Sequence, residues 1–181
     1  MQVQNHRDEM IAYWGAGSLT RWPKDTLLNV AIPVDAKAFL VDVGLPSPGR
    51  DIHGWVFEWD LALTPFNEAR KMRLLGRNRG FTPILIDESR NGQIVWDAAI
   101  GGYERHINAS VQQFGRSLIV LDQFRLEALR TIDADEPYDV VAVRRAAIAL
   151  RAKLKRIDET AMADENSLWS TIINDLRRET R

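Results

Sequence analysis

Residues 84–97, ILIDESRNGQIVWD, contain two short apolar runs separated by an Asn-Gly pair. Asn and Gly tolerate a positive φ angle, and their turn twists in the same sense as paired strands, so the segment predicts a β-hairpin. A two-residue turn would pair buried positions with exposed ones. A three-residue loop from Arg90 to Gly92, with the glycine in the left-handed region, avoids this mismatch. The predicted cross-strand pairs are therefore Ile86 with Trp96 and Ile84 with Ala98, all on one face.

The rest of the chain alternates between strand-like and helical patterns. Residues 54–61 alternate with a period of two, which predicts a half-buried strand with Trp55, Phe57, Trp59 and Leu61 on its apolar face. Residues 71–76 predict a weaker strand. Helical periodicity marks residues 8–14, 33–43, 107–121, 140–157 and 167–178. Strands joined by hairpins and flanked by blocks of helices predict a single α+β domain with a mainly antiparallel sheet of about six strands.

Two helix ends have clear sequence signals. Gly44-Leu45-Pro46 ends the helix at 33–43, because glycine takes the left-handed cap position and proline cannot continue the helix. Asn108 or Ser110 begins the third helix, and Ser110 with Gln113 has the spacing of a capping box. The apolar stripe of this third region consists of Ile107, Val111, Phe114, Leu118 and Leu121.

The chain has 181 residues, no cysteine and a formal net charge of -1. This length allows one domain that buries roughly 70% of its unfolded surface, so neither a metal nor a disulfide is needed for stability. The lack of cysteine excludes thiol catalysis, disulfides and cysteine-based zinc sites. The small net charge argues against a general nucleic-acid or membrane binder, and the apolar runs are too short to span a membrane. The N-terminus has no signal-peptide pattern, so we expect a cytoplasmic location.

Few residues suggest catalysis or metal binding. The Gly-Ala-Gly at 15–17 lacks a preceding strand and a third glycine, so a helix stop explains it better than a dinucleotide site. The three histidines have no Glu or His at metal-ligand spacing. Asp87 and Glu88 are adjacent, and neighbours on a strand point to opposite faces, so we interpret them as solvated residues that flank the turn. The sequence therefore predicts no catalytic residue, no metal ligand and no cofactor.

Charged and aromatic residues outside the predicted core are candidates for partner binding. Trp22 lies in a predicted loop, where it is either an exposed interface anchor or a plug at the edge of the core. The patterns favour core positions for Trp55, Trp59, Trp96 and Trp169. The helix at 140–157 has six cations and no acid between 144 and 156, which we interpret as a solvated face. Acidic residues cluster on both sides of this helix, at Asp133, Asp135, Glu136 and Asp139, and at Asp158, Glu159, Asp164 and Glu165.

The order of several short motifs resembles the SUKH superfamily. The motifs are Ile32-Pro33-Val34-Asp35-Ala36 with Phe39-Leu40, Val43-Gly44-Leu45-Pro46, Leu75-Gly76, Ile84-Leu85-Ile86-Asp87 with Gly92-Gln93-Ile94-Val95, and Asn108-Ala109-Ser110 leading to Gln113-Phe114. Ile157-Asp158 with Ser167-Leu168-Trp169 is similar to the C-terminal helices of the fourth subfamily. The resemblance runs from about residue 10 to residue 178 and is weakest at 47–53 and 64–70. It implies one SUKH-like domain over residues 1–181, with a mixed sheet of about six strands wrapped by helices.

The resemblance also implies a function. Many bacterial SUKH proteins are immunity proteins that bind and neutralise polymorphic toxins, often nucleases or nucleic-acid deaminases. We therefore expect a non-catalytic protein that stays in the cytoplasm of the producing cell and covers the active site or substrate groove of a cognate toxin, without itself binding nucleic acid or a membrane. Acidic patches would steer it toward a basic groove. The expected contact residues are Trp22, Asp133, Asp135, Glu136, Asp158 and Glu159.

Two other functions remain open. SUKH-like domains also occur in regulatory scaffolds that have no toxin partner, and the identity of the partner would separate this role from immunity. An unrecognised hydrolase would use Asp60, Asp87, Glu88 or His106, and would require pH-dependent turnover that is lost when one of them is substituted.

Overall fold

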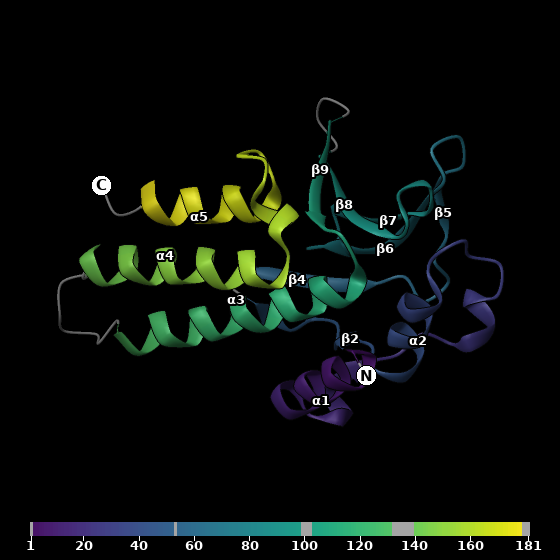
Figure 1. Cartoon of the computed structure of the whole chain (residues 1–181), viewed down its shortest axis with the longest axis horizontal. Coiled ribbons are helices and arrows are strands. Elements are labelled where there is room, and N and C mark those ends of the chain that lie inside the picture. Colours follow the sequence, from purple (N-terminus) through teal and green to yellow (C-terminus); the bar gives the residue numbers. More distant parts are fainter. Residues whose placement is uncertain (1, 53, 99–102, 132–139, 179–181) are drawn as a thin grey trace.

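The computed structural model describes residues 2–52, 54–98, 103–131 and 140–178, and these form an α+β fold (Figure 1). The helices are α1 (Gln2–Trp14), α2 (Val34–Asp42), α3 (Val111–Thr131), α4 (Val140–Ile157) and α5 (Leu168–Arg178). The strands are β1 (Leu19–Thr20), β2 (Leu45–Pro46), β3 (Asp51–Ile52), β4 (Trp55–Trp59), β5 (Pro65–Asn67), β6 (Met72–Asn78), β7 (Thr82–Asp87), β8 (Gln93–Ala98) and β9 (Tyr103–Asn108). Short 3-10 helices include η2 (Lys24–Leu27), η3 (Glu88–Arg90) and η4 (Glu159–Met162).

The described strands form one large sheet and one small one. The large sheet has seven strands in the order β3-β4-β6-β7-β8-β9, with β5 also paired to β6, and β1 pairs with β2 separately. Every pairing between the described strands is antiparallel. The predicted α+β class with a mainly antiparallel sheet is therefore confirmed, whereas the mixed sheet that the family resemblance implied is not found among these strands.

The hairpin that opened the sequence argument is present as β7 and β8, but its predicted register was wrong by two residues. The observed pairs are Ile84 with Trp96, Ile86 with Ile94 and Asp87 with Gln93. The loop is longer than predicted because the buried Asp87 carboxylate accepts the backbone N–H groups of Ser89 and Arg90 and so holds η3 in place. Asn91 and Gly92 follow, both with positive φ angles. A shift of two residues preserves the faces, so the predicted apolar face is correct.

Each region predicted to be helical contains a helix, although some limits differ. Helix α1 begins at Gln2, well before the predicted residue 8. Helix α3 begins at Val111 rather than near residue 107, because residues 103–108 form β9, which the sequence pattern did not reveal. Ser110 precedes α3, and its side chain accepts the N–H of Gln113 at 3.3 Å, so Ser110 rather than Asn108 is the cap.

The helices and one face of the sheet enclose the main core (Figure 1). Phe114 of α3 meets the rings of Phe57 and Trp59 of β4 edge-on, with centroids 6.1 and 6.4 Å apart, a favoured aromatic geometry. The predicted stripe Ile107, Val111, Phe114, Leu118 and Leu121 is buried throughout. The core assignment of four tryptophans is confirmed, since Trp169 is buried and Trp55, Trp59 and Trp96 pack against the core.

The end of α2 depends on Gly44. Its N–H donates to the carbonyl of Phe39 at 2.8 Å, and its φ angle of 86° lies in the left-handed region, as the sequence predicted. The next residue, Leu45, pairs with Thr20 of β1, which brings the Thr20 backbone close. A Cβ atom at position 44 would lie 2.1 Å from the Thr20 carbonyl oxygen. Position 44 therefore needs glycine for two reasons. Its φ angle is positive, and the pairing of β1 with β2 leaves no room for a Cβ atom beside the Thr20 carbonyl.

We expect Gly44→Ala to lower the free energy of unfolding by more than about 3 kcal/mol, because a left-handed alanine costs about 1–2 kcal/mol and the clash adds to it. Urea denaturation would measure the loss. Gly49→Ala is the matched control, because Gly49 has a φ angle of 77° but nothing within 4 Å of its Cβ position. Equal losses in the two variants would show that the contact with Thr20 is unimportant.

Candidate functional site

The large sheet has a second face, opposite the main core, with a small apolar cluster of its own. Among the described residues, no helix contributes to this cluster. This second cluster contains Met72, Leu85 and Val95, all buried, with Leu74 partly buried beside them. These residues alternate along β6, β7 and β8 with those that face the main core. This face is where charged side chains from several strands and loops meet above the sheet.

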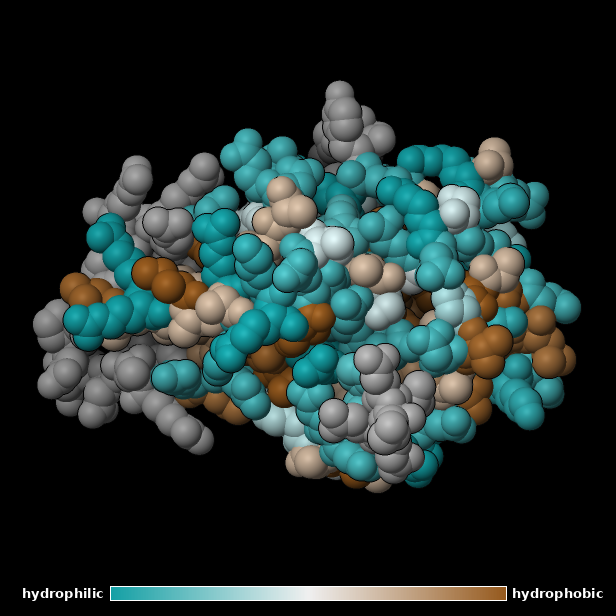
Figure 2. All heavy atoms as spheres, viewed as in Figure 1, coloured by the Kyte–Doolittle hydropathy of each residue, from teal (hydrophilic) through white to brown (hydrophobic). Residues whose placement is uncertain are grey.

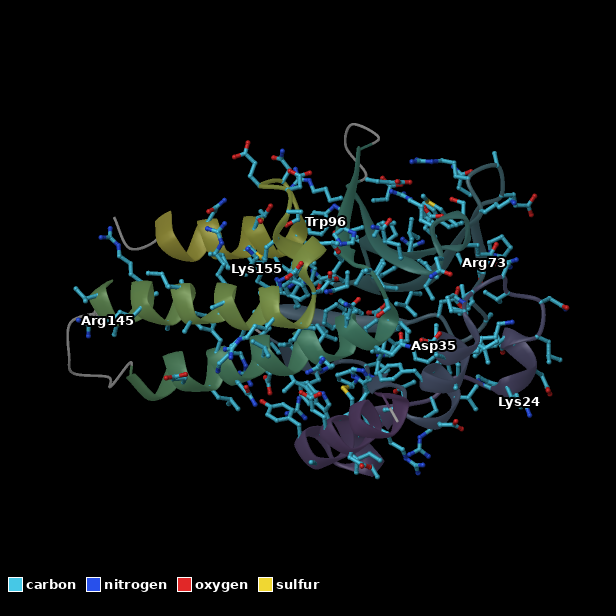
Figure 3. The ribbon with its side chains drawn as sticks, viewed as in Figure 1. Lys24, Asp35, Arg73, Trp96, Arg145 and Lys155 are labelled. Atoms are coloured by element: carbon cyan, nitrogen blue, oxygen red, sulfur yellow. The ribbon has the colours of Figure 1, made fainter. Side chains whose placement is uncertain are left out.

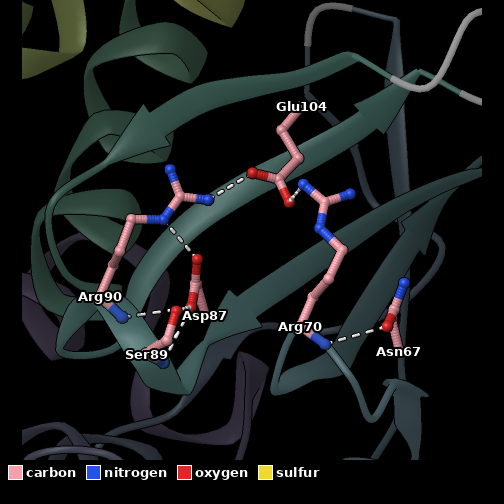
Figure 4. Close-up of polar contacts among 6 residues, drawn as sticks. All are labelled: Asn67, Arg70, Asp87, Ser89, Arg90 and Glu104. Atoms are coloured by element: carbon pink, nitrogen blue, oxygen red, sulfur yellow. Dashed lines mark hydrogen bonds and ion pairs between the residues drawn. The ribbon is translucent and has the colours of Figure 1, made fainter.

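Four of those side chains form a continuous chain of ion pairs (Figure 4). Arg90 of η3 pairs with both Asp87 of β7 and Glu104 of β9, and Glu104 also pairs with Arg70 from the loop before β6. The side chains of Asp87 and Glu104 are 1% and 12% exposed, whereas those of Arg70 and Arg90 are each 48% exposed. The chain of ion pairs therefore ties the edge strand β9 to η3 and to the loop between β5 and β6.

The charged forms of Asp87 and Arg90 are favoured in this chain of ion pairs. Burial alone would raise the pKa of Asp87, but hydrogen bonds from Ser89 and Arg90 outweigh it and hold the pKa below its usual range. Burial would also lower the pKa of Arg90, but its contacts with Asp87 and Glu104 raise it instead. A general acid or base needs a pKa close to the working pH. The Asp87 carboxylate and the Arg90 guanidinium thus brace the sheet and are poorly suited to proton transfer. The prediction that Asp87 is a solvated turn residue was wrong, because its burial lets it cap η3.

The other residues considered for hydrolysis are also held in structural contacts. Asp60 accepts the N–H groups of Ala62 and Thr64, and Glu88 pairs with Arg73. The His106 ring lies between Gln93 and Thr160, at 2.6 and 2.9 Å, and burial lowers its pKa more than the Asp158 charge raises it. Among the described residues, no group of three or more His, Cys, Asp or Glu side chains could hold a metal ion.

Asp158 lies in a buried polar cluster rather than on the surface. Its carboxylate accepts the Asn108 side-chain N–H at 3.0 Å and the Ala109 backbone N–H at 2.7 Å, and it also caps η4 through Thr160. The Trp169 indole donates to the Asn108 side-chain oxygen at 3.1 Å. Asp158 is only 3% exposed, so its expected place on an exposed contact surface was wrong. A carboxylate with this many donors is instead a structural group that joins β9 to the C-terminal helices.

Trp22 is buried as well. It is 1% exposed, its indole N–H donates to the Asp60 carbonyl at 3.0 Å, and its ring lies 6.1 Å from that of Trp59. The expectation of an exposed anchor was therefore wrong, and the alternative of a plug in the core is the one observed. Of the other expected contact residues, Glu159 is exposed, and the segment with Asp133, Asp135 and Glu136 lies outside the described residues.

Helix α4 is amphipathic, and its exposed side combines several cations with one exposed isoleucine. Val143, Ala147, Leu150 and Leu154 are buried on one side. We call the opposite, exposed side the basic face; it consists of Arg144, Arg145, Ile148, Arg151, Lys155 and Arg156. Ile148 is 63% exposed in the middle of these cations. Arg145 points away from the helices in Figure 3, and apolar atoms lie among hydrophilic ones along this helix in Figure 2. The prediction of a solvated basic face is confirmed, with an exposed isoleucine that it did not include.

An apolar hollow lies between η2 and α2. Its volume is about 340 Å³, and its lining includes Leu27, Ala38 and Val41. Leu28 and Val34 at its rim are 65% and 83% exposed, and apolar atoms are visible over this region in Figure 2. The hollow offers a site for an apolar side chain, and the charged residues Lys24, Lys37 and Asp42 also line it.

The fold and these surfaces define an α+β protein whose polar groups either hold the fold together or lie on its surface. A family model described as SUKH-4 immunity protein matches residues 6–175, and the chain belongs to this family. No curated protein and no solved structure matches the chain. None of the helices in the described ranges is long and apolar enough to cross a membrane.

We expect Asp158→Asn to lower the free energy of unfolding near neutral pH by about 1–3 kcal/mol, since it removes the charge from a group that accepts several buried donors. Burial would raise the pKa of Asp158, but hydrogen bonds from Thr160, Ala109 and Asn108 lower it overall. An unfolded Asp has a pKa of about 3.9, so this stabilisation is present above that pH and is lost as pH falls through the lower folded pKa. The decline of stability in acid should thus be shallower in the variant, as measured by urea denaturation at several pH values.

The exposed neighbour provides the control for this experiment. Glu159→Gln makes the matching change from acid to amide on a residue whose side chain is exposed. Its stability should change by less than about 0.5 kcal/mol at every pH. An unchanged acid dependence in Asp158→Asn would show that Asp158 is not held ionised in the folded state.

The ion-pair chain predicts unequal effects for its two arginines. Arg90→Met leaves the buried Asp87 without its charged partner, and should cost about 1–3 kcal/mol of unfolding free energy. Arg70→Met leaves Glu104 paired with Arg90 and should cost less than about 1 kcal/mol. Chemical denaturation of both variants measures the difference, and equal costs would contradict the role assigned to Asp87.

Proposed function

We propose that this protein is a non-catalytic immunity protein that binds a cognate toxin domain and neutralises it in the cytoplasm of the producing cell. Membership of the SUKH-4 immunity protein family supports this role. The proposed toxin is a nuclease or a nucleic-acid deaminase, as the resemblance implied.

The proposal that the protein is non-catalytic is supported by the hydrogen bonding and ionisation of the side chains considered as general acids or bases. Asp87 and Asp158 are both held ionised by hydrogen bonds, and each bonds to a backbone N–H as well as to side chains. His106 is partly buried between two hydrogen-bonding partners, and burial lowers its pKa, which favours its neutral form. Each of these groups is already used by the fold. A protein whose ionisable side chains are committed in this way is suited to act through its surface.

Four of the residues expected to contact the toxin remain proposed contacts. They are Asp133, Asp135, Glu136 and Glu159. Glu159 is exposed beside the C-terminal end of α4 and is therefore available to a partner. Trp22 and Asp158 are withdrawn from this set because both are buried.

Stoichiometry provides the test. The toxin domain encoded next to this protein's gene would be titrated with the purified chain, and its activity on nucleic acid followed. We expect linear loss of activity that is complete at about one equivalent, because a tight binder inhibits only the molecules that it occupies. Growth rescue on co-expression should accompany it, with a toxin domain from an unrelated system as the control.

Three outcomes would contradict the proposal. Inactivation of excess toxin by a small fraction of an equivalent would indicate catalysis. A lack of both inhibition and rescue would exclude immunity against this toxin. Recovery of a stable complex with a housekeeping protein in place of the toxin would support the regulatory scaffold.

A further inference from the structure

We infer that the basic face of α4 docks the toxin domain, and that the toxin surface it takes is acidic around an apolar centre. The inference rests on the proposed function, because the toxin domain is the partner. It differs from the sequence-based expectation, in which acidic residues of this chain meet a basic groove.

The first support is that three of the cations on the basic face are unpaired. Arg145, Arg151 and Lys155 are exposed, and within the described part of the chain they make no ion pair. Six arginines elsewhere in the described chain differ from these three cations. Arg50, Arg70, Arg73, Arg90, Arg116 and Arg125 all pair with a carboxylate. Both arginines of α3 that the structure describes and four near the sheet are thus paired within the fold, whereas Arg145, Arg151 and Lys155 are left to solvent or to a partner.

The second support is that helix stability does not explain the cations. No acid lies between residues 144 and 156, so Arg145 and Arg151 have no acidic neighbour three or four residues away, and like charges at this spacing destabilise a helix. The helix macrodipole favours Lys155 and Arg156 near the C-terminal end, but it gives no support to Arg145 or Arg151, which lie outside the last turn. Arg145 and Arg151, which gain nothing from the macrodipole or from acidic neighbours along the helix, therefore point to an external partner.

The third support is the apolar part of the same face. Val141, Ile148 and Lys155 are seven residues apart and so lie on one line along α4. Val141 and Ile148 are 55% and 63% exposed. A mainly apolar hollow of about 330 Å³ lies between α3 and α4. It is lined by Phe124, Ala142, Val143, Ala146 and Ala149, and by the charged residues Glu127 and Arg145. An exposed aliphatic residue among arginines, next to an apolar hollow, resembles the core and rim of a protein interface.

The charges also decide between possible occupants. A second copy of this chain would bring cations against cations if the two α4 helices met, which is repulsive. A membrane surface or a nucleic acid presents an extended sheet or rod of negative charge. The exposed acids Glu159, Asp164 and Glu165 follow α4 directly, and the whole chain has a net charge of -1, so an extended polyanion would be repelled beside the basic face. An acidic patch of limited size on a protein fits this face best.

Binding of the toxin domain to charge-reversed variants tests the inference. The toxin domain from the neighbouring gene, with its catalytic residues substituted, would be immobilised and the affinity of each variant measured at low and high salt. Arg145→Glu with Lys155→Glu should weaken binding by at least about tenfold and reduce the salt dependence of the affinity. Arg7→Glu with Arg21→Glu makes the same change in net charge at exposed sites away from α4, and should change the affinity less than about threefold.

The apolar centre is tested separately. Ile148→Ala should weaken binding by about fivefold or more without changing the thermal stability, because its side chain is 63% exposed in the free protein. Val34→Ala is the matched control, since Val34 is an exposed aliphatic residue of the α2 hollow. If Val34→Ala weakened binding and Ile148→Ala did not, the docking surface would be the hollow between η2 and α2, and the inference would be overturned.

A reversal of the acidic segment completes the set. If Asp133→Lys, Asp135→Lys and Glu136→Lys together abolish binding while the α4 reversal leaves it intact, the basic face is not the docking surface and the sequence-based hypothesis stands. If the α4 reversal binds as tightly as its control, the inference fails while the proposed function stands. If the wild-type chain neither binds nor inhibits the toxin, the proposed function fails and the inference with it.

Discussion

The buried carboxylate of Asp158 is the interaction on which the arrangement of the C-terminal half depends. A buried charge is costly unless every acceptor position is used, and Asp158 obtains its donors from Asn108 at the end of β9, from the Ala109 backbone and from Thr160 of η4. Trp169 of α5 then binds the same Asn108. These hydrogen bonds form together only when four segments meet. The segments are the end of β9, the start of α3, η4 and α5.

This constraint fixes the position of α4. The helix lies between α3 and α5 in the helical layer (Figure 1), and its last residue, Ile157, accepts a hydrogen bond from Gln113 of α3 at 3.1 Å. Its buried residues are held in the core on one side, so its other side is presented on a rigid element. Binding to a surface that is already ordered loses less conformational entropy than binding to a loop. On the sheet face opposite the main core, Arg70 and Arg90 are already paired with Glu104 and Asp87.

Local features of the fold could be predicted from the sequence, whereas features that depend on distant partners could not. The Gly44 cap, the Ser110 cap and the faces of the β7–β8 hairpin follow from residues that are close in the chain. The register of that hairpin failed because Asp87 caps η3 only once it is buried. Strand β9 was missed because its polar residues, Glu104, Arg105 and His106, give no apolar alternation.

The same distinction explains the candidate contact residues. Trp22 stands between an arginine and a proline, which suggests exposure, but its hydrogen-bond acceptor is the carbonyl of Asp60, 38 residues away. Asp158 begins an acidic run in the sequence, but its donors at 108 and 109 are about fifty residues away. The basic face of α4 was correctly predicted to be solvated because helical spacing and the lack of acids are local properties. Its exposed isoleucine was not predicted, because periodicity cannot show which apolar residue lies outside the buried stripe.

The charge expected on the partner surface therefore depends on which charged side chains of this protein remain unpaired in the fold. The net charge of the whole chain does not reveal that. By composition the chain is almost neutral and its acids cluster beside α4. In the structure, one of those acids, Asp158, is buried. Arg145, Arg151 and Lys155 remain exposed without a carboxylate partner among the described residues. A groove that binds nucleic acid is itself basic, so it would repel this face. If the toxin acts on nucleic acid, a protein that docks through α4 meets the toxin outside that groove and inhibits it by obstruction or by holding its conformation, without imitating the substrate.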